Sequence, residues 1–96
     1  MRFEWDPGKE AINRRKHGLT FGDVPSLFTS GADYLEIPDL DHDDDDERYI
    51  AIGPVKRGVV MVVFTERHDD TIRIISARKA TRTEITLYRQ HLGKHP

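Results

Sequence analysis

The chain contains no cysteine, which excludes disulfide bridges, thiol nucleophiles and zinc–thiolate sites. Its longest apolar run, residues 59–64, is far shorter than the ~20 residues that a membrane helix needs. We therefore expect a soluble, cytoplasmic protein without a membrane partner. With 96 residues, of which only 8% are aromatic, the chain supports one small domain spanning residues 1–96. Any site should be a surface cleft lined by charged side chains.

The charged residues are unevenly distributed along the chain. The formal net charge is −2, but residues 39–47 hold seven of the 17 Asp and Glu residues. The rest of the chain carries 15 Lys and Arg against ten Asp and Glu, a net charge of +5. A basic body with one acidic segment is suited to a polyanionic partner such as a nucleic acid.

The acidic segment DLDHDDDDE admits three interpretations. It lacks the spaced ligands and the turn glycine of a calcium loop, and consecutive carboxylates cannot all point at one ion. A solvated loop is therefore favoured over a metal site. A third hypothesis is that the segment contacts basic residues of a partner protein or shields the basic body from nucleic acid. We expect neither a metal nor a cofactor.

Hydrophobic periodicity predicts an α+β fold with two N-terminal helices, a four-stranded antiparallel sheet and a C-terminal helix. The opening residues should form a short strand or an extended lead. Asp6 as N-cap and Pro7 as first helical residue begin the first helix, and Gly18 ends it. Short turns between the last three strands favour an antiparallel meander. The second helix is expected at residues 23–28, and the strands at residues 34–37, 48–55, 59–66 and 72–79.

The last quarter of the chain combines a basic strand with a capped helix. Thr81 and Glu84 form a capping box, in which each side chain bonds the other residue's backbone amide. Alternation along the strand predicts two faces, one with Ile72, Ile74 and Ser76 and the other with Arg73, Ile75 and Ala77. Arginine and apolar side chains are therefore interleaved, which is typical of a surface that faces phosphate.

Five segments resemble the BrnT family of toxins: FEWDPGK, NRRKHGLTF, ERYIAIG, VVFTER and RIISARKATRTE. They follow one another in the family's order and span nearly the whole chain. The resemblance implies a RelE-like fold and a type II toxin, a ribonuclease that inhibits translation. It also implies a BrnA-like ribbon-helix-helix antitoxin, which neutralises the toxin. The complex of the two would bind operator DNA through the antitoxin and repress its own operon.

Cleavage of RNA by its own 2′-hydroxyl needs a base, an acid and cations that stabilise the transition state, and no metal is obligatory. His17 is the leading acid or base because an imidazole titrates near neutral pH. The alternative is that His17 only ends a helix. Glu47 is a second candidate base, although its acidic neighbours make the end of a solvated loop the simpler interpretation.

Arg48, Arg67 and Arg78 are candidate phosphate clamps, because guanidinium groups bind phosphate through two parallel hydrogen bonds. Surface salt bridges with Glu66, Asp69 or Asp70 are the alternative. The expected catalytic set is His17, Glu47, Arg48, Arg67 and Arg78. By the resemblance, Lys9, Asn13, Lys16, Arg73 and Lys79 would bind substrate. The alternative function is a catalytically silent basic module that docks an antitoxin or nucleic acid.

Overall fold

A computed structural model of the chain describes residues 1–40 and 47–93. Most of the acidic segment lies outside the described residues, and so do the three interpretations that rest on it. Among the described residues, no helix is long and apolar enough to cross a membrane. Within the same two ranges, no three His, Asp or Glu side chains come together as a metal site would require.

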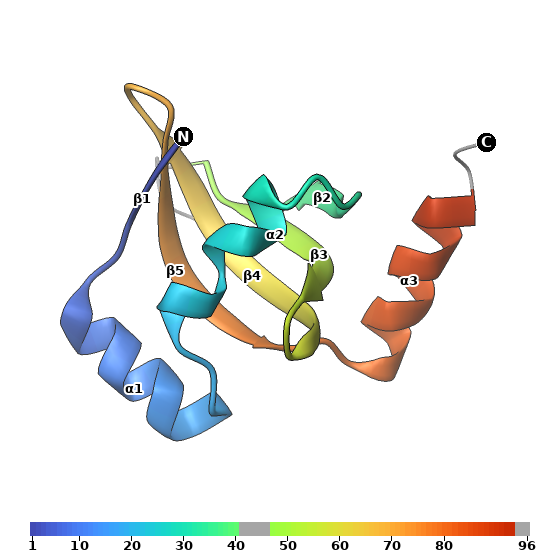
Figure 1. Cartoon of the computed structure of the whole chain (residues 1–96), viewed down its shortest axis with the longest axis horizontal. Coiled ribbons are helices and arrows are strands. Elements are labelled where there is room, and N and C mark those ends of the chain that lie inside the picture. Colours follow the sequence, from blue (N-terminus) through green and yellow to red (C-terminus); the bar gives the residue numbers. More distant parts are fainter. Residues whose placement is uncertain (41–46, 94–96) are drawn as a thin grey trace.

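The fold is built on a mixed five-stranded sheet (Figure 1). Its strands lie in the order β1 (Arg2–Glu4), β5 (Thr71–Lys79), β4 (Gly58–Arg67), β3 (Tyr49–Val55) and β2 (Leu35–Pro38). β1 is parallel to β5, and all other neighbours are antiparallel. The prediction of four antiparallel strands was therefore wrong. The opening residues form a fifth, parallel strand at the edge, because a partner about 70 residues away pairs with them.

The helices are α1 (Pro7–His17), α2 (Pro25–Thr29) and α3 (Arg82–Gly93), with a 3-10 turn, η1 (Phe21–Asp23), before α2. The predicted caps of α1 are confirmed. The Asp6 carboxylate accepts the Gly8 amide at 2.7 Å, and Gly18 ends the helix with a φ of 73°. The helix predicted at 23–28 is α2, which begins two residues later because Pro25 lacks an amide proton and is tolerated only in a first turn. The 3-10 turn η1 precedes it as a separate element.

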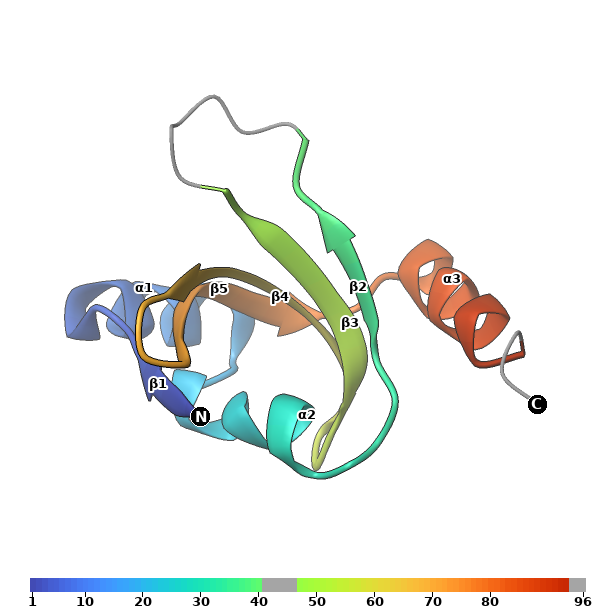
Figure 2. The same cartoon turned by 90° about the horizontal axis from the view of Figure 1, so that it is seen from above.

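The sheet has an inner face, which packs on α2 and η1, and an outer face on the opposite side. Figure 2 shows the sheet curved around α2, with α3 on the other side of β3. Phe21, Leu27 and Phe64 are fully buried on the inner side. Gly53 of β3 allows this close packing, because a Cβ there would lie 2.6 Å from the Leu27 Cδ1 atom.

Asn13 fastens α1 to the edge of β5. β1 ends opposite Arg73, so no described strand pairs with the outer edge of β5 beyond that point. The Asn13 amide nitrogen donates to the Ala77 carbonyl at 2.8 Å, and its amide oxygen accepts the Ala77 N–H at 3.1 Å. A second donation, at 3.1 Å, reaches the Leu19 carbonyl. The buried amide thus takes the place of a neighbouring strand and satisfies three backbone groups.

A β-bulge interrupts β5 at Ile75. Val63 pairs with Ser76, whereas the next residue, Phe64, pairs with Ile74. Ile75 is therefore one extra residue on the β5 side, and such an insertion shifts the alternation of all side chains beyond it.

The bulge corrects the predicted faces of β5. Simple alternation placed Ser76 on the apolar face and Ala77 beside Arg73, and both assignments were wrong. Ala77 is 1% exposed and pairs with the equally buried Val62, so it faces the core. Ser76 and Arg78 turn to the outer face, because the extra residue moves every later side chain to the other side of the strand.

Candidate nucleic-acid interface

Three of the predicted arginines lie on the outer face of the sheet. Arg73 is the cross-strand partner of Thr65, and Arg78 is the partner of Met61. Both partners alternate along β4 with residues that face the core, so they point outward. Arg67, two residues beyond Thr65, has the same orientation and is exposed. The outer face therefore gathers guanidinium groups from two adjacent strands.

Arg48 joins them from the third strand. The Asp39 amide donates to the Arg48 carbonyl at 2.9 Å, which extends the β2–β3 ladder one residue beyond β3. The next residue, Tyr49, packs toward the core, where its ring centroid lies 5.7 Å from that of Phe64. Alternation therefore turns Arg48 to the outer face. The structure thus brings all four predicted arginines to one side of the sheet.

Thr65 is a candidate that the sequence analysis missed. Its side chain is 4% exposed, and its hydroxyl has no hydrogen-bond partner among the described residues. Such a buried, unsatisfied hydroxyl costs roughly 1–3 kcal/mol, so it calls for an explanation. Thr65 lies directly beside Arg73 on the outer face. No pattern in the sequence TER distinguishes this threonine from one in an ordinary strand.

Two of the outer-face arginines are paired with carboxylates. Arg78 makes a double contact with Glu84, in which both nitrogen–oxygen distances are 2.8 Å. Arg73 contacts Glu4 at 3.1 Å. Glu84 also accepts the Thr81 amide at 2.8 Å, which confirms the predicted capping box of α3. The sequence analysis considered salt bridges to Glu66, Asp69 or Asp70. The observed partners of these two arginines are instead Glu4 and Glu84.

The Arg78–Glu84 pair should make stability depend on pH. The Arg78 hydrogen bonds hold the pKa of Glu84 below its ordinary value of 4.5. The pair therefore stabilises the fold above about pH 4.5 and loses this contribution as the pH falls through the lowered pKa. We expect Glu84→Gln to reduce the free energy of unfolding at pH 7 by about 1.5 kcal/mol. Urea denaturation at a series of pH values measures this difference, which should shrink below pH 4.5.

The more exposed pair provides a control for this prediction. Glu4 has a side chain that is 44% exposed, so Glu4→Gln should change stability by less than about 1 kcal/mol. A difference between wild type and Glu84→Gln that stays constant across the acidic range would contradict the assignment to an ionised carboxylate.

A groove of about 200 Å³ runs between α1 and the bulge of β5. Its polar rim contains Lys9, Lys16 and His17 from α1. The remaining lining residues are Ile12, Asn13, Ile75 and Ser76. The structure therefore brings together the predicted acid or base and two predicted substrate-binding lysines. Asn13 reaches the groove too, although its amide is fully used by the backbone of β5 and by Leu19.

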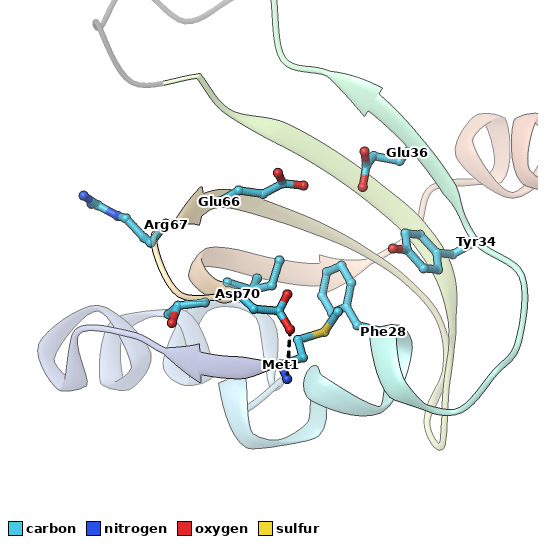
Figure 3. Close-up of a pocket in the computed structure, with 9 residues that line it drawn as sticks. Met1, Phe28, Tyr34, Glu36, Glu66, Arg67 and Asp70 are labelled. Atoms are coloured by element: carbon cyan, nitrogen blue, oxygen red, sulfur yellow. Dashed lines mark ion pairs between the residues drawn. The ribbon is translucent and has the colours of Figure 1, made fainter.

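Carboxylates gather on the inner face instead. A pocket of about 170 Å³ lies on this face. Figure 3 shows Glu36 and Glu66 directed toward the pocket and Arg67 directed away from it. Burial and the nearby Glu66 raise the pKa of Glu36. Burial, together with the two glutamates, also raises the pKa of Tyr34. Glu36 and Glu66 thus lie on the inner side of the sheet, whereas the four predicted arginines lie on the outer side.

Glu47 and Lys79 are separated from the other predicted residues. The Glu47 carboxylate accepts the Tyr49 hydroxyl at 2.9 Å, which raises the pKa of that tyrosine. This places Glu47 next to a side chain that packs on the inner face. Lys79 is exposed and pairs with Val60, whose side chain belongs to the core, so it does not share a face with Arg78.

Comparison with known proteins identifies the family. The family model described as "Ribonuclease toxin, BrnT, of type II toxin-antitoxin system" matches residues 5–84. The chain belongs to the BrnT family. This membership makes it a toxin of a type II toxin–antitoxin system and implies an antitoxin partner. The resemblance found in the five sequence segments is therefore confirmed.

A solved structure supports the same assignment. The crystal structure of the Brucella abortus ribonuclease toxin BrnT, at 1.1 Å resolution, is similar to this chain with a TM-score of 0.67 and 30% sequence identity. The match covers 85% of this chain and 99% of the Brucella protein. No curated protein sequence matches the chain significantly. The mixed sheet with three helices is thus a BrnT fold.

Proposed function

We propose that this BrnT-family toxin is an endoribonuclease that cleaves RNA in the groove between α1 and β5 and thereby inhibits translation. The observation that carries the proposal is the meeting of His17 with Lys9 and Lys16 in one groove, beside a guanidinium-rich sheet face. The family description as a ribonuclease toxin supports it. The RelE-like relationship expected from the sequence remains part of this proposal.

The proposed reaction is transfer of the phosphodiester within the RNA chain. A base removes the 2′-hydroxyl proton, the 2′-oxygen attacks phosphorus, and the bond to the 5′-oxygen breaks as that oxygen takes up a proton. The products are a 2′,3′-cyclic phosphate and a free 5′-hydroxyl. His17 exchanges these protons, while Lys9, Lys16 and the outer-face arginines bind phosphate. Its chemistry is complete without a metal ion.

We further propose that the partner is a BrnA-like ribbon-helix-helix antitoxin. Membership in a type II system implies that such a partner protein exists. In this proposal, operator DNA is bound only through the complex, because the antitoxin supplies the DNA-binding region. The toxin itself would act in the cytoplasm, where its RNA substrate is found.

One observation favours the alternative function, a catalytically silent docking module. Arg73 and Arg78 already contact Glu4 and Glu84, so part of the positive charge on the outer face is compensated within the chain. An RNA phosphate would have to compete with those carboxylates. Detection of RNA cleavage products separates the two functions, because a docking module forms none.

Replacing both groove lysines with alanine should weaken RNA binding and cleavage. For single-stranded nucleic acid, each lysine that contacts a phosphate adds about 0.7 to the slope of log Kd against log salt concentration. For Lys9→Ala with Lys16→Ala, we therefore expect the slope of log Kd against log salt to fall by about 1.4. The measurement combines fluorescence anisotropy with labelled RNA and a gel assay of cleavage in the presence of EDTA.

A matched double variant outside the groove controls for net charge. Lys56 lies in the β3–β4 turn and Arg89 on α3, and both are exposed. Lys56→Ala with Arg89→Ala should leave cleavage and the salt slope close to wild type. Intact RNA after prolonged incubation with folded wild-type protein would refute the ribonuclease proposal and leave the docking module.

A further inference from the structure

An apolar row crosses the outer face of the sheet. Ile37, Ile50 and Val63 stand side by side on β2, β3 and β4, because each is the cross-strand partner of the next. The bulge residue Ile75 continues the row onto β5, next to the partner of Val63. All four side chains are half-buried. The row therefore crosses three strands directly, and Ile75 adjoins it beside Ser76, the residue of β5 that pairs with Val63.

The C-terminal helix covers only the neighbouring part of this face. Ile52, two residues along β3 from Ile50, is 1% exposed. Tyr88 of α3 is itself buried, and its hydroxyl donates to the Asp33 carbonyl at 3.0 Å, which holds the helix near the start of β2. Figure 2 shows α3 against the β3 side of the outer face. The residues Ile37, Ile50 and Val63 lie one row further along the strands than Ile52, and their side chains remain partly exposed.

The composition of the row indicates a protein partner. Single-stranded nucleic acid packs its bases on aromatic rings, and the row contains only aliphatic side chains. A contiguous apolar strip with a polar rim is typical of a protein–protein interface. The rim here carries Arg48 and Arg73 along one side of the row and Arg78 along the other. Glu4 is paired with Arg73, and Glu84 is paired with Arg78.

We propose that the apolar row is the docking site of the antitoxin. The fitting segment is amphipathic, with apolar side chains that cover the row and carboxylates that reach the flanking guanidinium groups. This proposal rests on the assignment to a type II system and deepens the proposed function. Because Ile75 belongs both to the row and to the RNA-binding groove, the bound antitoxin excludes RNA from the groove.

A double variant of the row tests the proposal. Ile50→Gln with Val63→Gln removes apolar contacts without changing any charge. We expect the Kd for the purified antitoxin of the same system to rise about tenfold or more, since interface anchors contribute more than about 1 kcal/mol each. RNA cleavage by the free toxin should stay within about threefold of wild type. Calorimetric titration and the gel assay give the two quantities.

Further variants keep the test decisive. Leu87→Gln is the matched control, because Leu87 is an exposed leucine on α3, 44% exposed and outside the row. If the double variant does not fold, Val63→Thr retains the side-chain shape and should still weaken antitoxin binding.

Unchanged antitoxin affinity in a folded row variant overturns the proposal, as does loss of RNA cleavage with full antitoxin binding. If wild type binds antitoxin through the row but leaves RNA intact, the docking proposal stands and the ribonuclease proposal fails.

Discussion

Replacing Asn13 with alanine is expected to lower the free energy of unfolding by about 3 kcal/mol, because a buried unsatisfied polar group costs roughly 1–3 kcal/mol. The substitution removes the partner of the Ala77 N–H, the Ala77 carbonyl and the Leu19 carbonyl at once. For a domain of this size, the melting temperature should fall by roughly 15 °C. Thermal and urea unfolding followed by circular dichroism measure both changes.

The adjacent residue provides the control for this prediction. Ile12 lies on the same helix but is 60% exposed, so Ile12→Ala should change stability by less than about 0.5 kcal/mol. A loss below about 1 kcal/mol for Asn13→Ala would mean that water or a shifted helix satisfies the edge of β5 equally well. The amide would then have no structural role at that edge.

Replacing His17 with alanine is expected to slow RNA cleavage by about 10²- to 10⁴-fold, the usual contribution of a general acid or base. His17 lines the groove with Lys9 and Lys16, where the phosphate would be held by the two ammonium groups. RNA affinity should change little, because the lysines remain. Single-turnover cleavage at saturating RNA, together with the Kd from fluorescence anisotropy, separates the catalytic effect from binding.

A second histidine serves as the matched control. His68 is exposed in the turn between β4 and β5 and is not among the residues that line the groove. We expect His68→Ala to cleave RNA at the wild-type rate. Equal rates for His17→Ala and wild type would remove His17 from the mechanism and return it to a residue that only ends α1.

The local elements of the fold were predictable because their signals are local. Asp6 and Gly18 cap α1, and the capping box of Thr81 begins α3. Each of these caps involves only residues that are close together in the sequence. A short strand was predicted for the opening residues, but its parallel pairing with β5 was not, because that pairing depends on the packing of everything between them. The second helix was predicted to within two residues, and it begins at Pro25, where proline is tolerated in a first turn.

The candidate site shows the same limit. Lys9, Asn13 and Lys16 are spaced four and three residues apart, which puts them on one side of α1, and all three line the groove. Nothing in the sequence revealed that the Asn13 amide would be used by β5, or that Glu84 would hold Arg78. Both contacts join distinct elements, so only the tertiary arrangement determines them. The sites themselves remain predictions that the variants above test.

The extra residue in β5 has a consequence for how related chains are compared. Arg73 and Arg78 are separated by an odd number of positions, which in an uninterrupted strand would direct them to opposite sides. Because Ile75 is an extra residue in the bulge, the alternation shifts by one position and both guanidinium groups lie on the same side of the sheet. The spacing between them is therefore as significant as their identity. A homologue that lacked one intervening residue would reach the same arrangement without a bulge, whereas one that kept the spacing but paired as a regular strand would direct a charged group into its own interior.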